Sequence, residues 1–278
     1  MPVARRLVGY VSPLILASVG AFYVSYADKY FLRLFGSLTD VGLYALAARI
    51  SSILGTIYQS FNMSWSADRY EIVKEENAGQ IYRQVFRFLS AAIILVGAAL
   101  AIFANDFFLV MTDPEFYPAG NIVPLLVLAT MARVSTMFCN FGIMLSERTG
   151  YMAESSWVKA IIATCGYLAL IPYFGVYGAA TALLVSNLVE FYMVNKNARR
   201  LYDMELRWGP VAMMLVIAVF CVGAAMLIPV GETDYFCMRL AIFAAFAATV
   251  YLLPVWEHED RQLIKAVLGK AIGFARFR

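Results

Sequence analysis

The sequence is poor in the residues that catalytic and metal centres usually need. Its 278 residues contain one histidine, His258, and charged residues make up only 15% of the chain. Acid–base and metal-assisted chemistry usually relies on clustered His, Asp or Glu side chains. The Gly-rich phosphate loop of ATP-hydrolysing proteins does not occur either. We therefore expect no enzyme activity, no catalytic residues, no bound metal and no cofactor.

The cysteine pattern and the net charge argue against two further classes of protein. All four cysteines fall inside apolar segments, and none is in a CxxC pair, so neither a disulfide framework nor a zinc site is indicated. They are Cys139, Cys165, Cys221 and Cys237. The formal net charge of +3 is too small to indicate binding to nucleic acid, and we expect no nucleic-acid partner.

Apolar residues are abundant. They make up 62% of the chain, with a mean hydropathy of +0.71, against roughly 45–50% in soluble domains. A bilayer core takes about 20 helical residues, which predicts an all-α bundle of about eight transmembrane spans. These are Leu7–Ala27, Val41–Ser66, Phe88–Val110, Ala119–Leu145, Met152–Ile171, Tyr177–Val194, Pro210–Val230 and Tyr235–Trp256. The first run could also be a signal peptide, but it is long for one and another span follows it.

The charge of the connecting segments alternates along the chain. The segments "ADRYEIVKEENAGQIYRQVFR" and "NKNARRLYDMELRWG" are rich in Lys and Arg, whereas "TDPEFYPAG", "PYFGV" and "GETD" have neither. By the positive-inside rule the basic segments and both termini are expected in the cytoplasm. Asp28, Lys29 and Arg33 break this rule on the outer side, which suggests that they are kept there for a task.

The C-terminal residues 257–278 have the pattern of an amphipathic helix. Leu263, Ile264, Val267 and Leu268 fall on one face at helical spacing, with basic residues elsewhere. We expect this tail to lie on the anionic lipids of the cytoplasmic leaflet. The alternative is a frayed, solvated chain end.

Arg49 and Arg133 lie well inside spans, where an arginine costs roughly 2.5–3.5 kcal/mol unless it faces the bundle interior or a wet cavity. Each belongs to a polar stripe with three- and four-residue spacing, and the stripe on the fourth span begins at Thr130. We expect these stripes to line a substrate cavity, with candidates Arg49, Ser52, Thr56 and Gln59 on the second span and Arg133, Thr136 and Asn140 on the fourth.

The alternative is that the arginines only pair with acids to hold helices together. Asp28 could reach Arg49, since both are expected in the outer half of the membrane. Lys159 and Glu190 lie at similar depth near the inner ends of the fifth and sixth spans, and we predict that they form a structural ion pair.

Two stretches resemble one transporter family. The segment "SYADKYFLRLFGSLTDVGLYALAARISSI" is similar to the entry into the second half of polysaccharide exporters. The segment "ERTGYMAESSWVKAIIATCGYLALIPYFGVYGAATALLVSNLVEFY" is similar to a helical hairpin of the same family. These are the Wzx-type oligosaccharide flippases, of the MOP superfamily that also holds lipid II flippases and MATE exporters.

The resemblance implies an architecture of two six-helix lobes, sometimes followed by two extra helices. Residues 1–201 would then form the second lobe, 202–256 the extra pair and 257–278 the tail. An N-terminal lobe or partner chain is expected to supply the other half. The implied substrate is an oligosaccharide linked to a polyprenyl diphosphate, moved across the bacterial inner membrane for surface polysaccharide synthesis. Arg49 and Arg133 would line the cationic cavity, with Asp28 and Lys29 at its outer rim.

Two other functions fit the same composition. A MATE-like exporter of small molecules would favour acidic residues in its lumen, against which the arginine-bearing stripes argue. A non-transporting subunit could assemble other enzymes of a polysaccharide pathway.

The expected topology can be tested by cysteine labelling in intact cells. Single cysteines at Glu115 and Thr233 should react with an impermeant thiol reagent from outside. Those at Gln80 and Asn197 should react only after permeabilisation, because the positive-inside rule assigns both to the cytoplasm. Labelling at Asn197 in intact cells would reverse the orientation.

Overall fold

The computed structural model describes residues 2–229, 231 and 233–252, and helices dominate this part of the chain. Seven of the helices are long and apolar enough to cross a membrane, which confirms the all-α polytopic bundle. The elements are α1 (Pro2–Phe35), α2 (Leu38–Ile72), α3 (Ala78–Met111), the 3₁₀ helix η1 (Pro114–Asn121), α4 (Val123–Leu145), α5 (Gly150–Leu201), α6 (Trp208–Met226) and α7 (Thr233–Leu252). The tail predicted over residues 257–278 lies outside the described residues.

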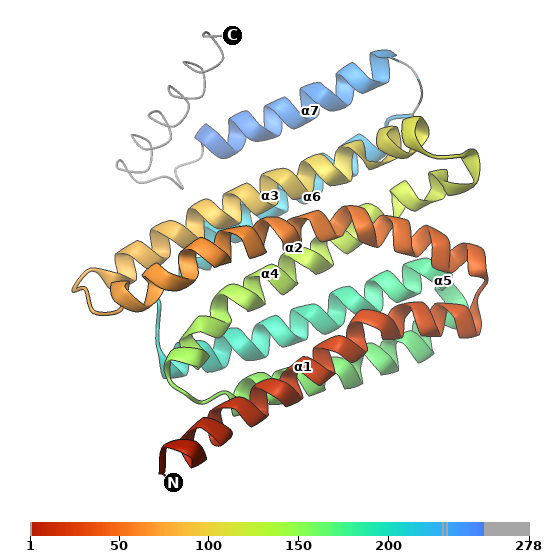
Figure 1. Ribbon diagram of the computed structural model, residues 1–278. Coiled ribbons are helices and arrows are strands. Elements are labelled where there is room, and N and C mark those ends of the chain that lie inside the picture. Colours follow the sequence, from red (N-terminus) through yellow and green to blue (C-terminus); the bar gives the residue numbers. More distant parts are fainter. Residues whose placement is uncertain (1, 230, 232, 253–278) are drawn as a thin grey trace.

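Helix α5 is a hairpin that contains two of the predicted spans. A straight helix of its 52 residues would be about 78 Å long, far more than the bilayer core. Gly175 interrupts it with φ 53° and ψ −127°, and a Cβ on Gly166 would lie 2.8 Å from the Cβ of Ala182. Figure 1 shows the two halves running side by side from this turn. Counted this way, the seven helices provide the eight predicted crossings.

The junction between α1 and α2 differs from the prediction. The first span was expected to end at Ala27, but α1 continues unbroken through Asp28 and Lys29 to Phe35. Nothing in the sequence stops a helix there until Gly36. A capping box then starts α2: the Ser37 hydroxyl accepts from the Asp40 N–H at 3.1 Å, and the Asp40 carboxylate accepts from the Ser37 N–H at 2.8 Å.

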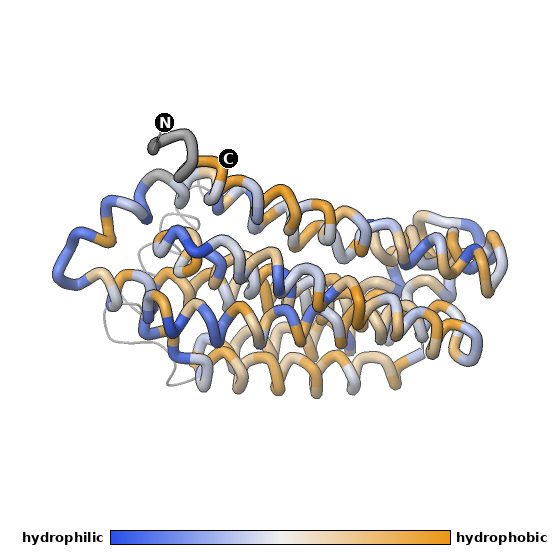
Figure 2. The backbone as a smooth tube through the Cα atoms, turned by 90° about the horizontal axis from the view of Figure 1, so that it is seen from below, coloured by the Kyte–Doolittle hydropathy of each residue, from blue (hydrophilic) through white to orange (hydrophobic). Residues whose placement is uncertain are grey.

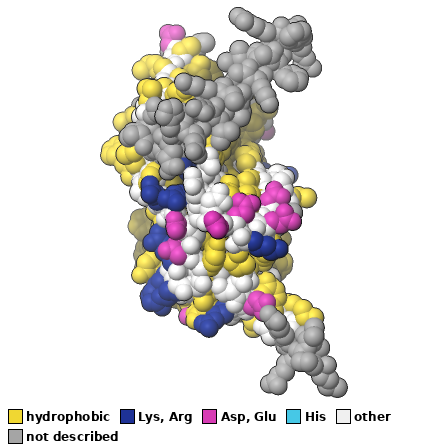
Figure 3. Space-filling model, turned by 90° about the vertical axis from the view of Figure 1, so that its left-hand side faces the viewer, with side chains coloured by type: hydrophobic (Ala, Val, Ile, Leu, Met, Phe, Trp, Pro, Cys, Tyr) yellow, Lys and Arg dark blue, Asp and Glu magenta, His cyan; other side chains and the backbone are white. Residues whose placement is uncertain are grey.

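The helices lie lengthwise in layers from α1 across to α7 (Figure 1). The start of α1 and the connections α2–α3, α4–α5 and α5–α6 meet at one end, which we call the basic end because the Lys- and Arg-rich segments lie there. Figure 2 shows hydrophilic residues gathered at this end and a mostly hydrophobic middle. Figure 3 looks onto the same end and shows Lys and Arg side chains beside Asp and Glu.

Helix α7 is fastened to α3 by a buried ion pair. Arg239, only 1% exposed, donates from Nη1 to both carboxylate oxygens of Asp106 at 2.6 Å. Its Nη2 donates to the carbonyls of Ile228 and Pro229 at 2.8 and 2.7 Å. The guanidinium thus binds both α3 and the α6–α7 connection, and the second apolar core, with Met214 and Phe246, forms beside it.

Candidate functional site

A polar cavity of about 350 Å³ lies between α1, α2, α4 and α5, and we call it the polar cleft. Helical spacing turns one face of each helix toward it, so that polar residues several turns apart meet in one space. Its polar lining comprises Ser25, Asp28, Lys29, Tyr44, Ser51, Ser52, Thr56, Gln59, Thr130, Arg133, Lys159 and Asn187. These side chains lie within helices long enough to cross a membrane.

Four of the seven predicted cavity residues line this cleft. Ser52, Thr56 and Gln59 come from α2, and Arg133 faces them from α4. The Ser52 hydroxyl donates to the Arg49 carbonyl at 2.7 Å, and Thr56 donates to the Ser52 carbonyl at 3.4 Å. Because each proton is used within the helix, the oxygens remain free to accept a hydrogen bond from a ligand.

The other three predicted residues lie elsewhere. Arg49 is exposed on α2 outside the cleft lining. Thr136 lies about 60° around α4 from Arg133, on a face that points away from the cleft. Its side chain is 3% exposed, and its hydroxyl donates to the Ala132 carbonyl at 3.0 Å. Asn140 is half-buried almost two turns beyond Arg133, past the end of the cleft.

The floor of the cleft is held together by Lys159 and Glu190. The Lys159 ammonium donates to the Glu190 carboxylate at 2.8 Å, with side chains 7% and 13% exposed. The pair joins the two halves of the α5 hairpin. One turn from Glu190, Asn187 donates to the Ala129 carbonyl of α4 at 2.8 Å, while its Oδ1 is enclosed without a partner in the described structure.

Asp28 is nearly enclosed, at 5% exposed, and its partner is its own neighbour. The carboxylate accepts the Lys29 N–H at 2.7 Å and lies 3.7 Å from the Lys29 ammonium. The Tyr44 and Tyr167 hydroxyls are enclosed, and neither has a hydrogen-bond partner among the described residues. The alternative in which Asp28 pairs with Arg49 is therefore not realised.

One of the three cationic side chains that line the cleft has no acidic partner among the described residues. Lys29 is engaged with Asp28 and Lys159 with Glu190. Within the part of the chain that the structure describes, Arg133 has no carboxylate partner. An unpaired guanidinium at this depth can be compensated by water or by an anionic ligand.

The sequence prediction missed four lining residues: Ser25, Tyr44, Ser51 and Asn187 were not selected. Thr130 was placed in the polar stripe but not among the site candidates, and Lys159 was assigned only to the ion pair. Asn187 had a usable signal, because it lies three residues before Glu190 and so on the same face of the helix. Tyr44 and Ser51 had none, since such residues are common in any span.

Comparison with known proteins gives one informative similarity. The chain is 19% identical over 274 residues to a protein of Haloferax volcanii named probable low-salt glycan biosynthesis flippase Agl15. The match covers 95% of this chain but 58% of that relative, so the chain spans little more than half its length. No family model matches the chain. No solved structure matches it either. The similarity supports a flippase-like membrane protein.

The cleft floor predicts the behaviour of Lys159 and Glu190 variants. Lys159→Met leaves the buried Glu190 carboxylate unpaired and should lower the free energy of unfolding by about 3–5 kcal/mol. Glu190→Gln leaves the Lys159 ammonium unpaired and should cost about as much. The exchange Lys159→Glu with Glu190→Lys should recover most of the loss. Thermal unfolding of the purified variants measures this, and losses that simply add in the double variant would mean that the two groups do not interact.

Proposed function

We propose that this chain forms one lobe of a flippase that moves a polyprenyl-diphosphate-linked oligosaccharide across the bacterial inner membrane. Two findings support this: the similarity to a protein named as a glycan biosynthesis flippase, and the polar cleft within membrane-length helices. The single observation that carries it is Arg133, a cleft-lining guanidinium without a carboxylate partner among the described residues.

Arg133 suits the diphosphate because its planar fork matches two phosphate oxygens at once. The hydroxyls of Ser52, Thr56 and Thr130 and the amide of Gln59 share the cleft with it. The Gln59 amide can donate to a phosphate or sugar oxygen. The three hydroxyl oxygens, whose protons are used within the helices, can accept from sugar hydroxyls along about 30 Å of hydrocarbon. Because Lys29 and Lys159 are already paired, the net attraction stays moderate, and the substrate can leave again.

In this proposal the chain belongs to the Wzx-type exporters of the MOP superfamily. Residues 1–201 form its second six-helix lobe, and 202–256 add two helices. Both termini and the basic end face the cytoplasm, as the positive-inside rule requires. Transport follows from rocking of this lobe against another one, with the cleft exposed first to one side and then to the other.

Arg49 has its role at the junction between the lobes. It is exposed on α2, outside the cleft lining, and within the described residues no carboxylate pairs with it. Lipid would penalise a bare guanidinium there, whereas a second lobe would enclose it in the shared path. The proposed partner lobe therefore covers this side of α2, and Arg49 meets the substrate between the lobes.

The acids of the cleft argue against a cation-coupled exporter of small molecules. Such a transporter needs a carboxylate that is free to bind a cation. Here Asp28 is engaged with Lys29, and Glu190 with Lys159. The surplus charge of the cleft is positive, which favours an anionic substrate.

Surface glycan export by the complete transporter tests the proposal. Arg133→Ala and Arg49→Ala should each lower export about tenfold or more, since a charged hydrogen bond contributes roughly 1.5–3 kcal/mol. Arg133→Lys should lower it less, because it keeps charge but loses the bidentate geometry. Arg200→Ala, an exposed site at the basic end, is the matched control. Unchanged export by both alanine variants at normal protein level would overturn the proposal.

A further inference from the structure

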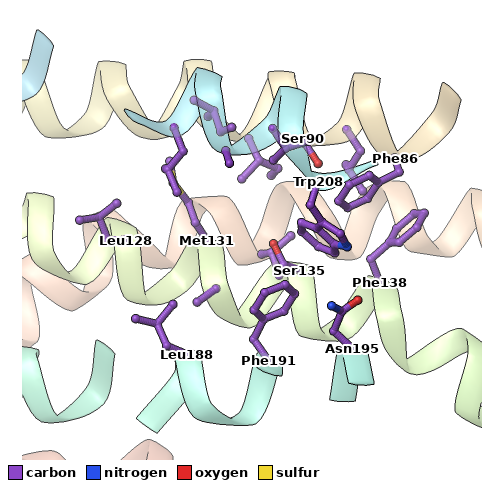
Figure 4. Close-up of a pocket in the computed structure, with 18 of the residues that line it drawn as sticks. Phe86, Ser90, Leu128, Met131, Ser135, Phe138, Leu188, Phe191, Asn195 and Trp208 are labelled. Atoms are coloured by element: carbon purple, nitrogen blue, oxygen red, sulfur yellow. The ribbon is translucent and has the colours of Figure 1, made fainter. Parts of the chain in front are cut away.

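A second and larger cavity lies on the other side of α4. It has a volume of about 520 Å³, within the range of ligand pockets, and is enclosed by α3, α4, α5 and α6 (Figure 4). We call it the α6 cavity. It exists because α6 packs mainly against α3 and stands away from α4 and α5. Most of its lining is apolar, with Leu128, Met131, Leu188 and Leu215 along its length.

The α6 cavity is separate from the polar cleft. Helix α4 forms the wall between them, with Thr130, Arg133 and Met137 facing the cleft and Met131 and Ser135 facing the cavity. Val134 alone lines both. A molecule in the α6 cavity is thus separated by α4 from the Arg133 guanidinium, which we assign to substrate binding.

One end of the α6 cavity is polar. The Trp208 ring lies edge-on to Phe86 and Phe191, with ring centroids 4.6 and 4.8 Å away, and closes the cavity toward the basic end. Its indole N–H is enclosed and has no acceptor among the described residues. Figure 4 shows the Asn195 amide beside Phe191 at the same end. The cavity therefore combines a long apolar body with the Asn195 amide at one end.

Basic residues surround this polar end. Arg83 lies one turn before Phe86, Arg199 one turn after Asn195, and Arg207 directly before Trp208. The Arg83 guanidinium donates to Glu205 at 3.1 Å, which fixes the α5–α6 connection over the end of the cavity. Arg207 is exposed beside it. Basic pockets between membrane helices at this depth are suited to anionic lipid headgroups.

We propose that the α6 cavity binds an anionic glycerophospholipid of the leaflet on the basic side. One acyl chain fills the apolar body, an ester carbonyl accepts from the Asn195 amide, and the phosphate lies near Arg207. The carrier lipid of a substrate held at Arg133 is disfavoured as the occupant of this cavity, because α4 stands between the two sites. A bound phospholipid would hold α6 to α4 and α5. This site is independent of the transport proposal.

Lipid analysis of the purified full chain tests this inference without any transport assay. Mass spectrometry should find one anionic phospholipid retained per chain after detergent washing. Ala212→Trp places a ring in the α6 cavity and should abolish retention. Ala224→Trp, on the same helix but outside the cavity lining, is the matched control and should retain the lipid. Equal retention by both variants would overturn the proposal.

A second measurement needs no variant and covers the case in which Ala212→Trp fails to fold. Wild-type chain stripped of lipid is titrated with phosphatidylglycerol, phosphatidylcholine or a polyprenyl phosphate, and thermal unfolding is followed. Phosphatidylglycerol should raise the unfolding temperature most. No shift with any of the three, or the largest shift with the polyprenyl phosphate or with phosphatidylcholine, would contradict the assignment.

Discussion

The absence of water from the hydrocarbon core is the constraint on which this structure depends. A charged side chain there must be neutralised by the protein, by a wet cavity or by a ligand. Two buried pairs obey the first option: Lys159 with Glu190 at 2.8 Å and Arg239 with Asp106 at 2.6 Å. Arg133 has no such partner within the described chain. By the same constraint it needs a wet cavity or an anionic ligand, and the proposed function rests on this.

The same pairs also determine the architecture. Lys159 and Glu190 tie together the two halves of α5, which also meet at the turn around Gly175 and in the close packing of Gly166 against Ala182. The Arg239 guanidinium draws α7 and the end of α6 onto α3. Between these two fastened regions stands α4, polar toward the cleft and apolar toward the α6 cavity. The two sides of this helix can therefore hold a charged substrate and the acyl chain of a phospholipid in separate places.

Much of the fold could be predicted because the bilayer demands long apolar helices, which hydropathy detects. The hairpin turn was also visible, since "PYFGV" interrupts an apolar run with Pro and Gly. It was harder to predict which residues of a span face the cleft. Thr136, for example, fits the three-residue spacing from Arg133 but points away from the cleft. The Arg239–Asp106 pair was not predicted, although both residues lie near the outer ends of their predicted spans and could have been matched by depth, as Lys159 and Glu190 were. Asp28 and Lys29 suggested the end of a span, yet charges alone do not stop a helix.

The central claim is that the polar cleft is a wet path within the membrane, and water accessibility tests it most directly. The measurement is the rate at which a charged, membrane-impermeant thiol reagent modifies single cysteines in membranes, with the four native cysteines replaced. Thr130→Cys, in the cleft lining, should react rapidly, whereas Ile161→Cys, 61% exposed on α5 and outside that lining, should hardly react. Equal rates, or an inert cysteine at Thr130, would contradict the account.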